Sequence, residues 1–423
     1  MMVALPEQSS RTDVVVIGGG PAGSTAATLV ARAGHRVTLL ERERFPRYHI
    51  GESLIPETFW VLERLGVLDR LRDAAYVQKR SVQFVTGTGK LSAPFYFQEH
   101  KPHDSSQTWQ VERADFDLMM LDNAREAGVE VHEGTRVLEV LFDGERARGV
   151  AIADPAAPGG RREIHADVVV DAAGQSGLIL DRLGLREWDP VLKKAALWTY
   201  WKGATRDTGR DSGATLVMQL DNKLGWFWYI PLRDDVTSIG VVAPFEYLFK
   251  DRPTKDHEAI YREELARCPG LQSRLGEATQ FGPYRAAKEY SYRSRQVAGD
   301  GWVLVGDAFG FLDPLYSSGI LLALHSGAKA ADAIVAGLAA GDTSAERLGS
   351  WGAEYVAGME RMRRLVCEFY DGFNFGGFVK KHPDLKGHIT DLLIGDLFTS
   401  RTDVLVEPMD SFRAERQALP AAG

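Results

Sequence analysis

The run DVVVIGGGPAG at residues 13–23 constrains the fold of this 423-residue chain more than any other feature. Residues 14–17 are all β-branched, which is typical of a buried strand in a parallel sheet. A G-x-G-x-x-G pattern follows, ahead of a helix predicted over residues 24–33. Such a loop permits a tight turn, a close approach of backbone to pyrophosphate, and close helix–strand packing, with the phosphates at the helix start. The run therefore predicts a dinucleotide site formed by Gly18, Gly20, Pro21, Ala22 and Gly23.

An acidic residue follows at the distance that a dinucleotide site requires. A second strand is predicted over residues 36–40, and Glu41 ends it eighteen residues after Gly23. A carboxylate at that position binds ribose hydroxyls and disfavours a 2′-phosphate. Arg42 begins the charged run that comes next and is a further candidate for binding the cofactor.

Composition and charge exclude several classes of protein. Hydrophobic residues make up 44% of the chain, which suits two domain-sized cores, and the net charge of −8 argues against a nucleic-acid partner. Cys268 and Cys367 give neither a metal-binding spacing nor a disulfide framework, so we expect no metal and a reducing, cytoplasmic location. The apolar stretch after Gly319 is interrupted by charges such as Lys329 and Asp332, so we expect no membrane span.

Two later strand ends repeat the arrangement of the first. Residues 166–171 form a strand-like run that ends at Asp171, with Gly174 in the following turn. Residues 302–306 form another, followed by Asp307. Ligands of open α/β sheets bind at the carboxyl ends of the strands, so we expect both acids at a cofactor site.

Several polar positions have two interpretations from the sequence alone. Glu52 and Ser53 suit either the edge of a cofactor or a simple turn and helix cap. Arg113 is suited either to pair with a phosphate or hold the edge of a flavin, or to form a salt bridge at the start of a helix predicted over residues 118–127. Lys79, considered alone, is most simply a solvent-exposed lysine.

The middle of the chain changes character. From about residue 192 to 287, aromatic and β-branched segments follow one another, interrupted by a helical and polar stretch over 253–275. This pattern predicts an antiparallel sheet that forms one wall of a substrate site. From residue 344 onward the chain is largely helical, and its aromatic side chains are expected to pack together rather than to bind a cofactor. These aromatic residues are Phe369, Tyr370, Phe373, Phe375 and Phe378.

The three strand-end signals resemble the FAD domain of the p-hydroxybenzoate hydroxylase superfamily. The resemblance implies an α/β fold with a Rossmann-type FAD-binding domain, an inserted, mainly antiparallel β-sheet substrate domain and a helical C-terminal region. We expect the FAD-binding domain at residues 10–50, 105–180 and 290–340, the substrate domain at 51–104 and 181–289, and the helical region at 341–423. The implied FAD contacts are Gly18, Gly20, Pro21, Ala22, Gly23, Glu41, Arg42, Glu52, Ser53, Arg113, Val137, Asp171, Gly174, Asp307, Pro314 and Gly319.

Within that superfamily, three features resemble the flavin-dependent halogenases. The segment Trp226-Phe-Trp-Tyr-Ile-Pro231 matches the family's W-x-W-x-I-P signature, and residues 311–319 match its F-x-x-P-x-x-S-x-G motif. Lys79 lies where the family has its essential lysine. Packing of an ordinary core strand explains the tryptophans alone, but not the coincidence with the other two features.

The resemblance implies a chemistry. Reduced FAD, O2 and chloride or bromide give hypohalous acid, with the halide held by the N–H groups of Ser318 and Gly319. Tryptophan side chains separate flavin from substrate, and a lysine presents the electrophilic halogen to an electron-rich ring, where a cationic donor polarises the bond to halogen. Since no dedicated NAD(P)H domain is recognisable, a separate flavin reductase is implied. The implied catalytic residues are Lys79, Trp226, Trp228 and Ser317.

One departure from the family pattern bears on the substrate. Tryptophan halogenases carry a glutamate just before the serine of the second motif, and here that residue is Tyr316. The chain is therefore more similar to phenol or pyrrole halogenases, several of which act on carrier-protein-bound substrates. Two rival functions stay open: an FAD-dependent monooxygenase or geranylgeranyl-reductase-like oxidoreductase, and a non-catalytic flavin- or carrier-binding protein. Candidate basic residues for docking a carrier are Arg361, Arg363, Arg364, Lys380 and Lys381.

Overall fold

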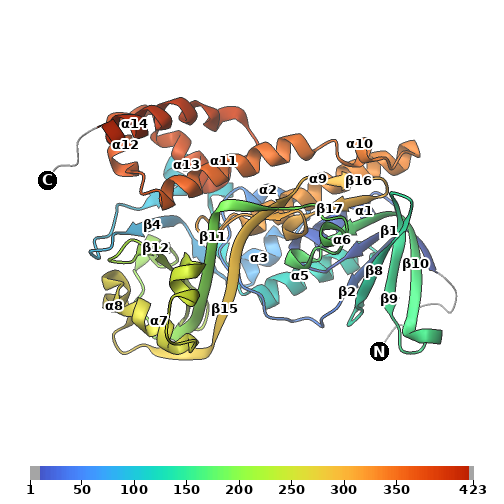
Figure 1. The fold of residues 1–423 in the computed structure, drawn as a ribbon, viewed down its shortest axis with the longest axis horizontal. Helices are drawn as coiled ribbons and strands as arrows, with labels where there is room; N and C mark the ends of the chain where they lie inside the picture. The colour runs from blue at the N-terminus through green and yellow to red at the C-terminus, as the bar shows by residue number, and fades with distance from the viewer. Residues whose placement is uncertain (1–9, 419–423) are drawn as a thin grey trace.

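The computed structural model describes residues 10–418 and contains two large sheets (Figure 1). The first sheet has the strand order β16-β17-β10-β1-β2-β7, and β9 and β8 extend it from β10. Its strands are β1 (Ser10–Ile17), β2 (Val37–Glu41), β7 (Glu130–Glu133), β8 (Val137–Asp143), β9 (Arg146–Ala153), β10 (Arg161–Asp171), β16 (Ala298–Gly299) and β17 (Trp302–Leu304).

Parallel pairing in this sheet brings the predicted strand ends together. In register, Ile17 of β1 pairs with Asp171 of β10 and with Leu40 of β2, and Asp171 pairs with Leu304 of β17. Because all four strands run in the same direction, their carboxyl ends share one edge of the sheet. The three glycine- and acid-bearing turns of the sequence therefore meet there.

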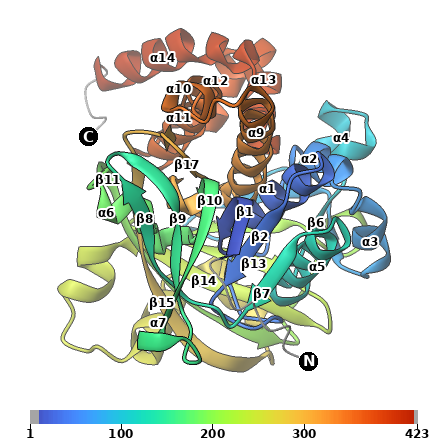
Figure 2. The ribbon, with the colours of Figure 1, turned by 90° about the vertical axis from the view of Figure 1, so that its right-hand side faces the viewer.

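Helices cover this sheet (Figure 2). Helix α1 (Pro21–Arg32) packs against both α5 (Arg113–Glu126) and α9 (Gly319–Ala340). Helix α5 begins at Arg113, before the predicted residue 118. Helix α9 is the one helix among the described residues that is long and apolar enough to cross a membrane. However, 61% of its most apolar 18-residue stretch is buried inside the protein.

The second sheet has the strand order β18-β15-β11-β14-β13-β12-β4-β5 and is antiparallel except where β12 pairs with β4. Its antiparallel core confirms the expectation for the middle of the chain. Its strands are β4 (Ser81–Val85), β5 (Phe95–Tyr96), β11 (Arg186–Lys202), β12 (Thr215–Gln219), β13 (Trp226–Pro231), β14 (Val236–Pro244), β15 (Thr279–Ser294) and β18 (Gly310–Phe311).

The two faces of the second sheet belong to different cores. Along β13, Trp226 and Trp228 pack into the main core, which also contains the first sheet. Phe227 and Tyr229, which alternate with them, pack into a second core. Helices α7 (His257–Ala266) and α8 (Pro269–Leu275) contribute Tyr261 and other residues to that second core.

The remaining elements connect and cap the sheets. The segment over residues 58–73 forms two short helices separated by a turn at residues 65–67. The C-terminal helices form a layer along one side of the molecule in both views (Figures 1 and 2). The elements are α2 (Thr58–Arg64), α3 (Leu68–Asp73), β3 (Val77–Lys79), α4 (Phe97–His100), β6 (Thr108–Gln110), α6 (Leu178–Arg182), α10 (Ala345–Leu348), α11 (Gly352–Tyr370), α12 (Phe375–Lys381), α13 (Lys386–Ile394) and α14 (Val406–Ala418).

Candidate active site

Residues of both sheets line a cavity of about 490 Å³, a size typical of cofactor sites. Most of the residues that the sequence predicted contribute to its lining. They are Gly18, Gly20, Pro21, Ala22, Glu41, Arg42, Glu52, Ser53, Arg113, Val137, Gly174, Trp226, Trp228, Asp307, Pro314, Ser317 and Gly319. Four predicted residues, Gly23, Lys79, Asp171 and Ser318, lie outside the lining.

The glycine loop has the geometry that its sequence predicted. Gly18 has a φ of +102°, and a Cβ there would lie 2.4 Å from the carbonyl oxygen of Ala172. A Cβ on Gly23 would lie 2.0 Å from the carbonyl oxygen of Gly18. Both positions therefore accept only glycine, and α1 can begin directly at the cavity with Pro21 in its first turn.

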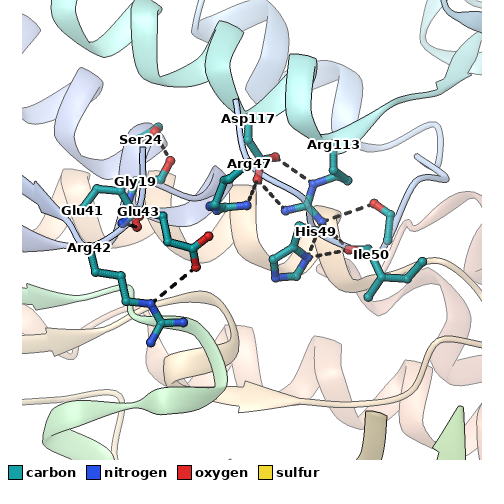
Figure 3. A network of polar contacts seen from close by, with 11 residues as sticks. Gly19, Ser24, Glu41, Arg42, Glu43, Arg47, His49, Ile50, Arg113 and Asp117 are labelled. Carbon is teal, nitrogen blue, oxygen red and sulfur yellow. Dashed lines mark hydrogen bonds and ion pairs between the residues drawn. The ribbon is translucent and has the colours of Figure 1, made fainter. Parts of the chain in front are cut away.

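Glu41 links the second strand to this loop (Figure 3). Its buried carboxylate accepts hydrogen bonds from the backbone N–H groups of Gly19 and Glu43, each at 2.8 Å. The side chain therefore fixes the conformation of the loop in addition to lining the cavity. A carboxylate has about four lone-pair sites, so it retains acceptor capacity for a ribose hydroxyl.

Arg113 makes the salt bridge of one interpretation and lies in the cavity lining, where the other interpretation places a cofactor. It makes an i,i+4 salt bridge to Asp117, at 2.8 and 2.9 Å (Figure 3). Arg47 shares the same fully buried carboxylate, with its Nη1 at 3.0 Å from Asp117 Oδ2. Two guanidinium groups on one carboxylate leave a net positive charge beside the cavity, which favours an anionic or electron-rich cofactor edge. Arg47 carries no signal in the sequence, because it follows a charged run and belongs to no specific motif.

The two later strand-end acids have different positions. Asp171 is fully buried, and its carboxylate accepts the backbone N–H groups of Ala173 at 3.1 Å and Ile179 at 2.8 Å. It holds the turn that carries Gly174 into the lining rather than lining the cavity itself. Asp307 does line the cavity, and desolvation raises its pKa to about 6 although Arg113 opposes the shift.

Trp226 and Trp228 form one wall of the cavity. Both indoles are nearly fully buried, and their ring centroids lie 6.4 Å apart. Trp228 donates its indole N–H to Ser238 at 3.1 Å. Gly240 of β14 lies directly opposite, and a Cβ there would come within 2.3 Å of the Trp228 ring and 2.5 Å of Trp198 Cβ. The wall therefore depends on a neighbouring position without a side chain.

The second motif ends at the start of a helix beside the cavity. Ser317 has a left-handed backbone with φ of +58°, which turns the chain into α9. Ser318 caps that helix with its backbone carbonyl and is buried, whereas Gly319 opens on the cavity. The first N–H groups of a helix lack intrahelical acceptors, so Gly319 presents a donor to the cavity.

Lys79 is buried, with an exposed fraction of 2%, contrary to the simple surface interpretation. Its ammonium donates to Ser53 Oγ at 2.8 Å and to the Leu54 carbonyl at 3.0 Å, and it faces the Phe97 ring at 5.9 Å. Desolvation alone lowers the pKa of Lys79 to about 7. Ser53 lines the cavity, so a single hydroxyl separates the cavity from this lysine.

These residues fit FAD. At Gly18 and Gly23 a Cβ would clash with backbone carbonyl groups, so glycine permits the tight turn and close packing that a dinucleotide loop needs, and a buried acid stands where the adenosine ribose is expected. From Glu41 the lining continues to the aromatic wall at Trp228, so the cavity offers a polar end for a nucleotide and an apolar end for a planar ring.

Comparison with known proteins agrees with this geometry. The FAD binding domain family matches residues 11–364. A tryptophan 2-halogenase of Chondromyces crocatus is 36% identical over 86% of this chain and 68% of that relative. A chlorinase of Pseudomonas fluorescens that acts on pyrrole-2-carbonyl-peptidyl-carrier protein is 31% identical over 95% of this chain and 92% of its own. The solved structure of the flavin-dependent brominase Bmp2 superposes with a TM-score of 0.83 at 30% identity, covering 96% of this chain and 98% of that one. The chain belongs to the flavin-dependent halogenases, within the family of FAD binding domains.

Proposed function

We propose that this halogenase uses reduced FAD, O2 and a halide to halogenate a phenol or a pyrrole, either free or tethered to a carrier protein. The observation that carries the proposal is the buried ammonium of Lys79, one hydroxyl away from a cavity with an FAD-type loop and a tryptophan wall. The relative that chlorinates pyrrole-2-carbonyl-peptidyl-carrier protein supports the substrate class, as does Tyr316 in the place of the tryptophan halogenases' glutamate.

FAD, when bound, supplies the redox chemistry with O2 that oxidises a halide ion. The chain holds it through the domain assigned to residues 10–50, 105–180 and 290–340. The start of α1 receives the pyrophosphate, Glu41 accepts from the adenosine ribose, and Arg113 stabilises the anionic edge of the ring system. Trp226 and Trp228 exclude the substrate from the flavin, which favours halogenation over direct hydroxylation.

The halide is proposed to bind the backbone N–H groups of Ser318 and Gly319, beside Ser317. These groups lie at the first turn of α9, where the helix dipole favours an anion. No neighbouring side chain contacts the place where a Cβ of Gly319 would stand, which leaves space for an ion. A halide bound there lies inside the cavity, on the same side of the tryptophan wall as Gly319.

Lys79 is proposed to hold the electrophilic halogen. A pKa of about 7 means that both the ammonium and the neutral amine are populated at neutral pH. The ammonium can donate to the oxygen of hypohalous acid and polarise the oxygen–halogen bond, while the amine can react with the acid to give a haloamine and water. Either form keeps a diffusible oxidant beside one ring, which confers selectivity.

We propose a separate flavin reductase as a partner and a cytoplasmic location. The basic residues suggested for binding a carrier protein are Arg361, Arg363, Arg364, Lys380 and Lys381. They are poorly suited to that role, because four of the five already form ion pairs with acidic side chains of this chain. Arg361 pairs with Asp403, Arg363 with Asp189, Arg364 with Asp410 and Lys381 with Glu415. A carrier partner would have to displace these pairs or dock elsewhere.

The test combines a substrate panel with variants of Lys79. The protein, a flavin reductase, bromide or chloride, and free or carrier-tethered phenols and pyrroles are incubated, and products are identified by mass spectrometry. Lys79→Met and Lys79→Arg should abolish halogenated product while O2 consumption continues, since a guanidinium places its donors differently and forms no haloamine. Lys90→Met, at an exposed position, is the matched control. Parental halogenation by both Lys79 variants would remove the lysine from the mechanism, and halide-independent hydroxylation would favour the monooxygenase rival.

A further inference from the structure

Two hydroxyl groups connect the ammonium of Lys79 with the cavity. Lys79 donates to Ser53 Oγ at 2.8 Å, and Ser53 Oγ lies 3.0 Å from Thr215 Oγ1. Ser53 and Thr215 both belong to the cavity lining, whereas Lys79 does not. All three residues have exposed fractions of 5% or less, so these contacts form inside the protein. The lysine therefore meets the contents of the cavity through these two hydroxyl groups.

A glutamine fixes the direction of the hydrogen bonds. The fully buried Gln110 donates from Nε2 to Thr215 Oγ1 at 2.8 Å and to the Gly213 carbonyl at 3.0 Å. An ammonium group has hydrogens to give and no lone pair, so Ser53 accepts from Lys79 and keeps its own hydrogen to donate. When Ser53 donates that hydrogen to Thr215, both lone pairs of the Thr215 hydroxyl are occupied.

One hydroxyl hydrogen is then left over. Among the described residues, Ser53 is the one contact of the Thr215 hydroxyl that could accept a hydrogen bond, and in this arrangement it donates instead. In the opposite arrangement Thr215 donates to Ser53, and the hydrogen of Ser53 is the free one. In both arrangements the pair offers one hydrogen to an oxygen atom of a molecule in the cavity.

Halogen transfer needs a proton at such an oxygen. When an aromatic carbon takes the halogen of hypohalous acid, the oxygen–halogen bond breaks and its electron pair stays on the oxygen. Without a proton donor the oxygen would depart as hydroxide, whereas a positioned acid lets it depart as water. Lys79 is an acid, but the cavity lining separates it from a molecule inside the cavity.

We propose that Thr215 and Ser53 relay a proton from Lys79 to the oxygen of hypohalous acid in the cavity. The proposal rests on the proposed function of Lys79. Thr215 gives its proton to the oxygen, Ser53 reprotonates Thr215, and the ammonium of Lys79 reprotonates Ser53. The ring carbon, which now carries both hydrogen and halogen, then loses its proton, and the same path returns one proton to the Lys79 amine. One C–H and one oxygen–halogen bond have become one C–halogen bond and one O–H bond of water, with no net proton.

The environment of Lys79 suits a group that loses and regains a proton in each turnover. Desolvation lowers the pKa of Lys79 to about 7, so the ammonium and the amine are close in free energy at neutral pH. A proton donor is most effective when its pKa lies near the working pH. The two hydroxyl groups need no shifted pKa, because each takes one hydrogen as it gives up the other.

Thr215→Val tests the relay, because valine resembles threonine in shape and has no hydroxyl. With FAD, a flavin reductase, a halide and a substrate that the parent halogenates, the variant should give about 10²-fold less halogenated product per O2 consumed. FAD affinity should not change, and Thr215→Ser, which keeps a hydroxyl, should restore the yield. Ser53→Ala should lower the yield as Thr215→Val does, because it interrupts the same path.

Thr199→Val is the matched control. Thr199 is also fully buried in the same sheet and accepts a hydrogen bond from a glutamine, Gln280 Nε2, at 2.9 Å, but it lies outside the cavity lining. Thr199→Val should therefore give the parental yield of product per O2. A parental yield from Thr215→Val, or a loss that Thr215→Ser does not restore, would overturn the relay and leave Lys79 to act on the halogen directly.

Hydrogen exchange at Lys79 provides a readout that does not depend on turnover. In the oxidised, FAD-bound protein with isotope-labelled lysine, NMR follows exchange of the Lys79 Nζ hydrogens with water, and Lys79→Met identifies the signal. Thr215→Val should lose the fast exchange, and Thr199→Val should keep it. Fast exchange in Thr215→Val would contradict the relay. If the parent fails to halogenate but its exchange depends on Thr215, the proposed function fails and the hydroxyl path stands.

Discussion

The indole N–H of Trp226 donates to the hydroxyl of Tyr370 at 3.0 Å, which ties the wall of the cavity to the last residue of α11. The Tyr370 hydroxyl also lies 3.2 and 3.3 Å from the two carboxylate oxygens of Asp313, which lines the cavity. The ammonium of Lys194 sits 3.9 Å from the centre of the Tyr370 ring. The C-terminal helices are therefore a structural part of the active site.

Tyr370→Phe should loosen the wall. The buried indole N–H of Trp226 loses its acceptor, which costs about 1–3 kcal/mol in the free energy of unfolding, measured in urea. A less rigid wall should also let more hypohalous acid escape, measured with a soluble trap that becomes halogenated. Tyr229→Phe removes a hydroxyl bonded to the Thr205 carbonyl at 2.8 Å in the second core, so it should cost stability without leakage. If Tyr370→Phe and Tyr229→Phe released equal amounts of hypohalous acid, Tyr370 would have no specific role in keeping the acid behind the wall.

Glu41→Ala should weaken FAD binding by about 1–3 kcal/mol, as expected for the loss of charge-assisted hydrogen bonds to ribose and of the bond that braces Gly19. Titration calorimetry of the apoprotein with FAD measures the change. Asp13→Ala provides the control, because Asp13 pairs with Arg36 and lies in β1 away from the cavity lining. Unchanged FAD affinity in Glu41→Ala would remove this acid from the cofactor site.

Lys79→Met should change how stability depends on pH. In the folded protein burial lowers the pKa of Lys79 from 10.5 to about 7, so between these values the unfolded chain binds the extra proton. This lysine therefore makes the parent more stable as pH rises through that window, and it imposes its full cost below pH 7. Urea unfolding should show that the stabilisation gained by Lys79→Met is largest at pH values below about 7 and shrinks as the pH rises from there toward 10.5. A gain that does not vary with pH would contradict the buried-ammonium interpretation, and Lys90→Met should show no such trend.

NADH or NADPH alone should leave the bound flavin oxidised. Residues of both sheets, including Trp226 and Trp228, enclose the flavin end of the cavity, and we assign reduction to a partner enzyme. Stopped-flow absorbance should record no bleaching of the flavin until a flavin reductase is added. Rapid bleaching by either nucleotide would instead favour the monooxygenase rival.

The parts of the site that the sequence predicted are those encoded locally. The glycine loop and Glu41 follow from strand, turn and helix patterns within thirty residues, and the strand ends meet because parallel strands share an edge. Lys79 shows the limit of that reasoning, since no local pattern indicated its burial and only its place in the family order marked it.

Contacts between distant segments account for what was missed. Arg47 and Asp117 meet across two segments whose sequences contain no shared pattern, and the same is true of Trp226 and Tyr370. The sequence predicts that the aromatic residues near Tyr370 pack among themselves. It does not predict the hydrogen bond between Tyr370 and Trp226 of the wall. Tertiary packing decides such pairs, so sequence periodicity carries no signal for them.

The absent side chain of Gly240 has an evolutionary consequence. Trp198, Gly240 and Trp228 lie side by side on three adjacent strands, and the glycine is opposite both tryptophans in register. Enlarging the central position requires a smaller side chain in place of the Trp228 ring and a shift of the strand that carries Trp198 Cβ, so a change at position 240 needs compensating changes beside it. Homologues in which the tryptophans of the wall have changed size should therefore also differ at position 240, although that residue lies outside the cavity lining.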